Sequence, residues 1–94
     1  MSTEKLSDDE IARELEELGG WTREGDAIQR EIEFDGFNDA IDFINRIAEH
    51  ADRADHHPEI FNVYNRVELT LTTHDAGGLT DKDFSLAAQI NDEI

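Results

Sequence analysis

The sequence predicts an α+β domain in which helices cover one face of a four-stranded antiparallel sheet, in the order α-β-β-α-β-β-α. Three segments repeat apolar residues at steps of three and four, as helices do. Between them lie two regions in which apolar and polar residues alternate, as in half-buried strands. The strands come in consecutive pairs, which favours antiparallel hairpins over parallel βαβ units. We expect residues 1–94 to form a single domain.

The first helix is expected over about Asp8–Leu18. Ser7 and Glu10 match a capping box, in which the serine hydroxyl accepts a hydrogen bond from the Glu10 N–H and the glutamate reaches back. Gly19 and Gly20 follow the last apolar position and end the helix.

The first pair of strands follows this helix. The short stretch 21–24 is compatible with a strand, and Gly25-Asp26 signals a turn. Apolar and polar residues then alternate over about Ala27–Phe34, which predicts a half-buried strand. Together the two segments indicate a hairpin.

A second helix is expected over about Phe37–Arg53, where apolar residues form a wide stripe. The stripe consists of Phe37, Ala40, Ile41, Ile44, Ile47, Ala48 and Ala51. Pro58 then favours extended geometry at His57.

The region after Pro58 is extended, with apolar residues on one alternating phase. These residues are Phe61, Val63, Val67, Leu69 and Leu71. Asn65 either marks a turn between two strands or lies within one long strand, and we favour the hairpin.

The last helix begins near Thr80, after the loop glycines Gly77 and Gly78. The run Thr80-Asp81-Lys82-Asp83 can cap it. Its apolar residues are Phe84, Ala87, Ala88 and Ile90.

The charge of the chain limits its partners. Twenty-four acidic against eight basic residues give a formal net charge of −16. This charge repels phosphate backbones and anionic membranes, and no basic cluster offsets it, so we expect no nucleic-acid or membrane partner. The carboxylates are spread along the whole chain and only two basic residues are lysines, which indicates adaptation to a salty cytoplasm or simply an acidic protein.

Other classes are excluded by what the sequence lacks. It has no cysteine, and hence no disulfide, thiolate nucleophile or Cys-ligated metal. No apolar run approaches the ~20 residues of a transmembrane helix. The first five residues do not match a secretory signal, so we expect a cytoplasmic protein.

The histidines are the candidate catalytic residues. His56 and His57 follow the second helix, and His74 ends a strand. Imidazoles transfer protons near neutral pH, so three at loop–strand junctions suggest acid–base chemistry, the alternative being solvated loop histidines. His50 lies within the helix and is expected to be structural.

A metal site is the rival interpretation. Asp52 and His56 are four positions apart, and the three histidines could form a His-rich site. However, adjacent histidines in an extended segment point to opposite sides. We therefore expect no metal.

Seven residues form a pattern with fixed spacings: Asp52, three residues, His56-His57-Pro58, five residues, Tyr64, nine residues, His74, eight residues and Asp83. This pattern resembles the signature of the pterin-4a-carbinolamine dehydratases. The runs 55–59, 61–67, 72–74 and 78–80, the pair Gly20-Trp21 and the spacing of Phe34 and Phe37 also resemble that family, so the similarity covers essentially the whole chain. Two departures are Ile60, where the family usually has Trp, and Asp52, where Glu is common.

The resemblance implies an enzyme that dehydrates 4a-hydroxytetrahydropterins to quinonoid dihydropterins, in the recycling of a tetrahydrobiopterin-type cofactor. By this analogy His56, His57 and His74 line the pterin pocket, with His56 and His74 favoured as proton donors and His57 as a binder. Asp52 would orient a neighbouring imidazolium.

Substrate contacts are expected from Asp55 and from the backbone near Thr72 and Thr73. The reaction needs no cofactor. Family members form dimers or tetramers, so we expect a homo-oligomer. Two alternatives remain, namely a related role in molybdopterin metabolism and a non-enzymatic dimerisation module on the same fold.

Overall fold

The computed structural model describes residues 4–94 and confirms the predicted fold class and element order. Residues 1–3, part of the stretch considered for a secretory signal, lie outside the described residues. The elements are α1 (Asp8–Leu18), β1 (Thr22–Glu24), β2 (Ala27–Glu33), α2 (Phe37–Ala54), β3 (Glu59–Val63), β4 (Arg66–Leu71), the short 3-10 helix η1 (His74–Ala76) and α3 (Asp81–Asn91). Among the residues described, no helix has the length and apolar character needed to span a bilayer.

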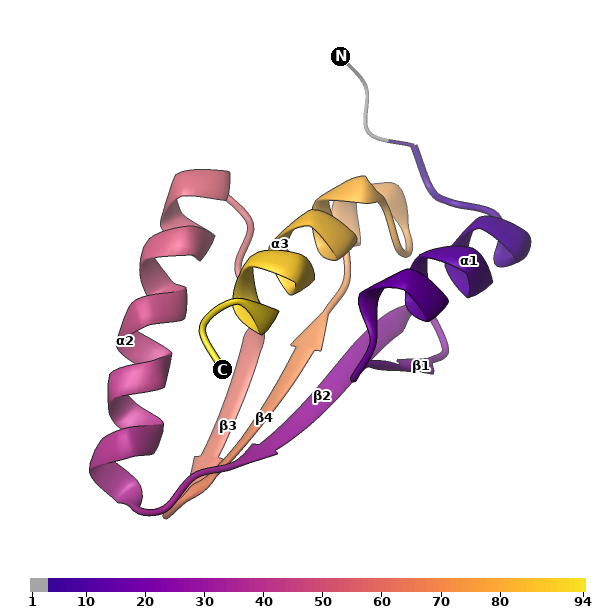
Figure 1. The fold of residues 1–94 in the computed structure, drawn as a ribbon. Coiled ribbons are helices and arrows are strands. Elements are labelled where there is room, and N and C mark those ends of the chain that lie inside the picture. Colours follow the sequence, from indigo (N-terminus) through magenta and orange to yellow (C-terminus); the bar gives the residue numbers. More distant parts are fainter. Residues whose placement is uncertain (1–3) are drawn as a thin grey trace.

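The four strands form one antiparallel sheet in the order β1-β2-β4-β3, and all three helices lie on one of its faces (Figure 1). The two central strands are paired so that Ile28 lies opposite Leu71 and Ile32 opposite Val67. All four of these side chains are buried. The core therefore fills the space between the sheet and the helices, to which the helices contribute Ile11, Ala40, Phe43, Ile47, Ala51, Phe84, Leu86, Ala87 and Ile90.

A two-residue turn joins β3 to β4, because Val63 pairs with Arg66. Tyr64 occupies the left-handed region in this turn, with a φ of 52°. The side-chain amide of Asn62 stabilises the turn by donating to the carbonyl oxygens of Tyr64 and Arg66.

The apolar residues of β3 and β4 share one alternating phase in the sequence, but this turn places them on different faces of the sheet. Residues directly opposite each other in an antiparallel pair lie on the same face, and Phe61 is opposite Glu68. Phe61 and Val63 therefore lie on the face without helices, where they are 57% and 52% exposed. Ile60 is the residue of β3 that lies opposite the buried Leu69. A two-residue turn pairs odd with even positions, so the shared phase does not mean a shared face.

The end of α3 is held by a single asparagine. Asn91 accepts hydrogen bonds from the Trp21 indole (2.8 Å) and the Arg30 guanidinium (2.7 Å). Its amide donates to the carbonyl oxygens of Leu18 and Gly19, where α1 ends. These bonds fix α3 against α1 and the sheet, and thereby position the beginning of α3, where the histidines gather.

Candidate active site

A polar cavity of about 280 Å³ lies where α2 ends, β4 ends and α3 begins. Its lining consists of Asp55, His56, His57, Thr72, Thr73, His74, Asp75 and Lys82. Every predicted site residue except Asp52 is in this lining, and Asp52 contacts one member of it, His57. The fold thus brings together residues from three separate parts of the chain.

The end of α2 directs the first two histidines into place. Asp55 adopts the left-handed conformation (φ 50°), and its N–H bonds to the carbonyl oxygens of Ala51 and Asp52. The N–H of His56 also bonds to the carbonyl of Ala51 (3.1 Å). Such a left-handed residue satisfies the last carbonyls of a helix and turns the chain away from its axis. The backbone that carries His56 and His57 is therefore fixed in position at the end of α2.

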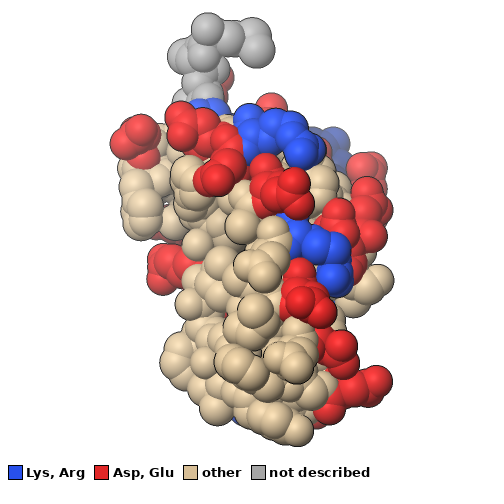
Figure 2. Space-filling model, turned by 90° about the vertical axis from the view of Figure 1, so that its left-hand side faces the viewer, with Lys and Arg blue, Asp and Glu red and all other residues tan. Residues whose placement is uncertain are grey.

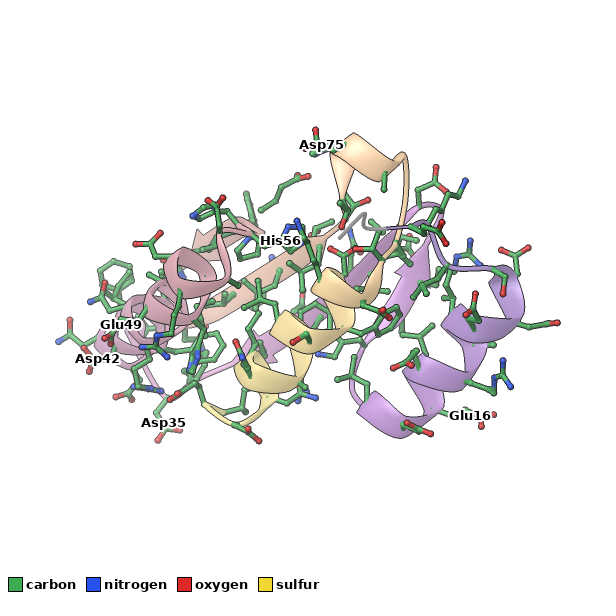
Figure 3. The ribbon with its side chains drawn as sticks, turned by 90° about the horizontal axis from the view of Figure 1, so that it is seen from above. Glu16, Asp35, Asp42, Glu49, His56 and Asp75 are labelled. Atoms are coloured by element: carbon green, nitrogen blue, oxygen red, sulfur yellow. The ribbon has the colours of Figure 1, made fainter. Side chains whose placement is uncertain are left out.

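His56 is paired with a buried carboxylate. Its Nε2 lies 2.6 Å from Oδ1 of Asp83, whose side chain is fully buried, and its own side chain is only 11% exposed. The other oxygen of Asp83 accepts from the Thr73 hydroxyl (2.8 Å) and the Thr80 N–H (3.0 Å). Three donors offset the cost of removing the carboxylate from water. In Figure 3, His56 lies inward, between the end of α2 and α3.

This arrangement assigns the roles of the two ring nitrogens of His56. A buried carboxylate that already accepts two hydrogen bonds acts as an acceptor toward Nε2, so Nε2 carries a proton. Nδ1 is then the nitrogen that can accept a proton in the neutral ring or donate one in the imidazolium.

Asp83 also caps α3. Its carboxylate accepts from the Thr80 N–H, while the Thr80 hydroxyl accepts from the N–H of Lys82. One carboxylate therefore both begins the helix and holds His56. The sequence analysis treats Asp83 as a member of the spacing pattern and as a cap, but not as a site residue. The capping motif was by itself a sufficient reason for a carboxylate at Asp83. Only the pattern of spacings indicated that Asp83 has a role beyond capping.

His57 has a different carboxylate partner. Its Nε2 lies 3.0 Å from Oδ1 of Asp52, in the last turns of α2. Both side chains are well exposed, 59% for His57 and 81% for Asp52. The adjacent histidines thus bond to partners on different elements, as expected of neighbours in an extended segment, yet both line the same cavity. The exposed pair is free to adjust, whereas the His56–Asp83 pair is held.

His74 lies at the start of η1 and also lines the cavity. The loop that carries it is closed by paired backbone bonds between Thr73 and Gly78. It is exposed, as is Lys82, a cavity residue that the sequence analysis did not select. Asp75 projects outward from η1 (Figure 3).

The two threonines of the cavity are engaged within the protein. The Thr72 hydroxyl donates to the carbonyl of Asp26 (2.6 Å), and the Thr73 hydroxyl bonds to Thr80 and Asp83. The backbone N–H of Thr73 also donates to the carbonyl oxygen of Gly78. The carbonyl oxygen of Thr73 accepts from the N–H groups of Ala76 and Gly78. These bonds make the cavity wall rigid.

His50 lies apart from the cavity. Its Nε2 donates to Glu93 (2.8 Å), whose carboxylate also pairs with Arg46 (3.2 Å). The hydrogen bond from His50 holds the pKa of Glu93 below its ordinary value of 4.5, and the positive charge of Arg46 contributes. This cluster ties the C-terminal segment to α2 and is structural.

Within residues 4–94, no three histidine, aspartate or glutamate side chains are arranged so that they could hold a metal ion. The cavity instead presents three imidazoles, an ammonium group and carboxylates, with one imidazole rigidly held. These groups can bind a small polar molecule and move protons on it.

Comparison with known proteins relates the whole chain to one family. A family model described as "Pterin 4 alpha carbinolamine dehydratase" matches residues 4–93. A protein of Mycobacteroides abscessus, provisionally named pterin-4-alpha-carbinolamine dehydratase, is 51% identical over 89 residues, 95% of each chain. A Nostoc protein with the same name is 52% identical over 86 residues, 92% of each chain. The crystal structure of a "transcriptional coactivator/pterin dehydratase" from Brucella melitensis has a TM-score of 0.92 at 38% identity, over 95% of this chain and 97% of that one.

Proposed function

The chain belongs to the pterin-4-alpha-carbinolamine dehydratase family of hydro-lyases, and we propose that it dehydrates a 4a-hydroxytetrahydropterin through its histidines. The observation that carries the proposal is the His56–Asp83 pair, a held imidazole in a cavity that His57 and His74 also line. The proposed physiological role is recycling of a tetrahydrobiopterin-type cofactor in the cytoplasm.

The reaction is a proton-coupled elimination without a change of oxidation state. The bond between C4a and its hydroxyl oxygen breaks, and the hydroxyl leaves as water after receiving a proton from an acid. The N5 electron pair forms the new C4a–N5 double bond, and the proton on N5 passes to a base. One proton donor and one proton acceptor therefore complete the chemistry, and no cofactor is required.

The three histidines divide these tasks according to how they are held. His56 is anchored by Asp83, and in our proposal it transfers a proton at Nδ1. His74, which lines the same cavity from η1, is the second proton-transfer group. His57, exposed and paired with the exposed Asp52, contributes binding and can adjust to the ring. The Asp52 carboxylate orients the His57 ring through the hydrogen bond at Nε2.

The cavity suits a small bicyclic ring. Its volume of about 280 Å³ is near the lower end of the ~300–1,000 Å³ of ordinary small-molecule sites. Asp55 offers a carboxylate to the amino and N–H groups of the pyrimidine part of a pterin. The backbone of Thr72 is a better candidate for a further contact than that of Thr73, because Thr73 bonds to Gly78 and Ala76.

The sheet edge supports a homo-oligomer. β3 is an edge strand, and it carries the exposed Ile60, Phe61 and Val63, with Tyr64 next to it. Unpaired strand edges and apolar patches favour association with another chain. Figure 2 shows the side of the molecule on which α2 lies, where a broad area is free of charged side chains. We propose that two copies meet along β3.

This assembly is tested by measuring the molar mass in solution by light scattering after size exclusion. We expect a dimer or tetramer for the natural chain, and monomers for a Phe61→Lys, Val63→Lys double variant. A natural chain that is monomeric at ~100 µM would contradict the assembly without touching the proposed chemistry.

The catalytic proposal is tested with the purified protein and a freshly generated 4a-hydroxytetrahydropterin, by following the absorbance of the quinonoid product. We expect the natural chain to accelerate product formation and His56→Ala to abolish most of that acceleration. No acceleration above the uncatalysed rate by the folded natural chain would refute it. A pterin of molybdopterin metabolism, the alternative substrate, is assayed in parallel.

A further inference from the structure

Tyr64 belongs to the spacing pattern of the sequence but does not line the polar cavity. It lies in the β3–β4 turn, whereas the cavity residue His57 precedes the first residue of β3 by two positions. β3 runs from the end of α2 to the opposite end of the sheet (Figure 1). Since its five residues rise ~3.4 Å each, the turn is roughly 17 Å from the cavity of the same chain. Tyr64 is therefore too far away to act there.

The backbone of Tyr64 suits a different amino acid. Its φ of 52° lies in the left-handed region, which glycine adopts freely and bulky side chains avoid. The side-chain amides of Asn62 and Asn65 bond to backbone carbonyls at and beside the turn, so the turn does not depend on the tyrosine ring. That side chain is 63% exposed. A bulky residue kept in a strained conformation indicates a function for its side chain.

The two edges of the sheet differ in how well they suit pairing with another chain. β1 has three residues, of which Arg23 and Glu24 are charged. β3 has five residues, and only Glu59 is charged. Charged side chains protect sheet edges from pairing. An uncharged edge on a chain with a net charge of −16 favours a second copy of the same chain, as proposed above.

The backbone groups of β3 limit the register of such a pair. Val63 and Arg66 flank the two-residue turn, so their backbone groups bond to each other. By alternation, the N–H and carbonyl groups of Ile60 and Asn62 point to the free edge. A two-fold axis perpendicular to the sheet makes the two copies of β3 antiparallel. Only residues whose groups point to the shared edge then bond to each other.

One register keeps all of these bonds. An axis through Ile60 places Asn62 opposite Pro58, which has no N–H. An axis through Asn62 places Ile60 opposite Tyr64, whose left-handed backbone lies outside the strand. An axis through Phe61 pairs Ile60 of each copy with Asn62 of the other, and each pair exchanges two bonds.

This register brings Tyr64 to the site of the other copy. With Phe61 on the axis, residues three positions to either side face each other, so Pro58 faces the partner's Tyr64. Neighbouring strands lie ~4.8 Å apart, a distance that a tyrosine side chain spans. His57, next to Pro58, is exposed and lines the cavity. Its Nε2 bonds to Asp52, which leaves Nδ1 for a hydroxyl donor.

We propose that the partner's Tyr64 completes each site by donating a hydrogen bond from its hydroxyl to Nδ1 of His57. This inference rests on the proposed dehydration and on the proposed pairing along β3. Asp52 and the partner's Tyr64 hold the His57 ring from its two nitrogens. Tyr64 is thus a positioning residue for a binding group, so its loss raises KM more than it lowers kcat.

Tyr64→Gly separates this role from folding. Glycine suits a φ of 52°, so the variant should keep at least the thermal midpoint of the natural chain. We expect its kcat/KM for a 4a-hydroxytetrahydropterin to fall about tenfold, because a loosely held imidazole orients the substrate less well. Tyr64→Phe, which lacks only the hydroxyl, should raise KM similarly. Phe37→Ala, which truncates an exposed aromatic side chain outside β3, is the control and leaves kcat/KM unchanged.

Mixed oligomers test whether the tyrosine acts across the interface. His56→Ala and Tyr64→Gly chains are unfolded in urea, mixed in equal amounts and refolded together. Random pairing gives about one quarter of the sites an intact His56 and an intact tyrosine from the partner, so kcat/KM should reach about a quarter of that of the natural chain treated in the same way. A mixture of His56→Ala with His74→Ala should stay inactive, because both histidines line the cavity of one chain.

The outcomes separate this inference from the proposals on which it rests. Recovery in the first mixture but not in the second supports it. A first mixture that assembles but is no more active than the average of its two components overturns it, while pairing and dehydration stand. Unchanged KM values in both Tyr64 variants also overturn it. A monomeric natural chain refutes the pairing and this inference together, and a natural chain without activity refutes the proposed function.

Discussion

The Nε2 atom of His56 lies 2.6 Å from Oδ1 of Asp83, although the residues are 27 positions apart in the chain. The bond joins the segment after α2 to the first turn of α3. It places a nearly buried imidazole next to a fully buried carboxylate that also caps a helix. Stability and the proposed catalysis therefore depend on the same side chain.

We predict that Asp83→Asn lowers kcat at least about tenfold with little change in KM, because a neutral amide accepts a weaker hydrogen bond than a carboxylate and holds the His56 ring less firmly. Asp83→Ala should in addition lower the free energy of unfolding by about 3 kcal/mol, as expected when one partner of a buried pair is removed. Steady-state kinetics and urea unfolding measure the two effects. The control is Asp81→Asn, exposed in the same helical turn. Equal kcat values for the two asparagine variants would contradict a positioning role.

The effect of replacing a histidine on the dehydration rate should depend on whether that histidine lines the cavity. His56→Ala and His74→Ala are each expected to lower the dehydration rate by ~10²-fold or more, the usual range for a general acid or base. His50→Ala should leave the rate nearly unchanged, because His50 bonds to Glu93 outside the cavity. All variants are assayed with the same freshly generated substrate. A harmless His74→Ala beside a damaging His50→Ala would overturn the site.

Proton transfer by imidazoles predicts that activity does not depend on metal. Treatment with a chelator should leave the rate unchanged, and elemental analysis should find no stoichiometric metal. A metal-dependent enzyme would lose activity and regain it when the ion is restored. Recovery on adding zinc or iron would replace the proposed mechanism but leave the fold unaffected.

The Glu93 cluster should make stability depend on pH in the acid range. In the folded protein the pKa of Glu93 lies below 4.5, chiefly because of the hydrogen bond from His50. The stabilisation is therefore complete above pH 4.5 and is lost as the pH falls through the lower, folded value. Glu93→Gln should lower the thermal midpoint at neutral pH, and its difference from the natural chain should shrink below pH 4.5. Glu49→Gln, an exposed change on α2, is the control and should show no such trend.

The acidic surface predicts stabilisation by salt. Glu16, Asp35, Asp42 and Glu49 all point outward (Figure 3), and the chain has only 8 basic residues for 24 carboxylates. The screening length falls from about 30 Å at ~0.01 M salt to about 3 Å at ~1 M, so repulsion between carboxylates weakens. The thermal midpoint should rise from ~0.05 to ~1 M KCl, with activity following it. A flat or falling midpoint would refute adaptation to a salty cytoplasm.

Local signals in the sequence were sufficient to predict where the helices begin and end. The first helix was expected over Asp8–Leu18 and occupies those residues, because the Ser7–Glu10 capping box and the following glycines act within one turn of the chain. The second was expected to end near Arg53 and ends at Ala54. The three site histidines were also accessible from the sequence, through the spacing of the motif.

The tertiary structure determines which face of the sheet a strand residue occupies and which partner a site side chain bonds to. Phe61 and Val63 share an alternating phase with Val67, yet lie on the other face, because the turn at Tyr64 and Asn65 has two residues. Strand alternation is a local property, whereas the face that becomes buried depends on which strand pairs with which and in what register.

The sequence alone determined that residues 4–94 form an α+β domain with His56, His57 and His74 at element ends. It did not determine the carboxylate that each imidazole bonds to. Asp52 precedes His56 by one helical turn but bonds to His57, while His56 bonds to Asp83 on another helix. Capping and periodicity depend on neighbours within about four residues, so the chain itself specifies them. The His56–Asp83 pair exists only after α3 packs against α2 and the sheet, because packing alone removes the water that would otherwise solvate both groups.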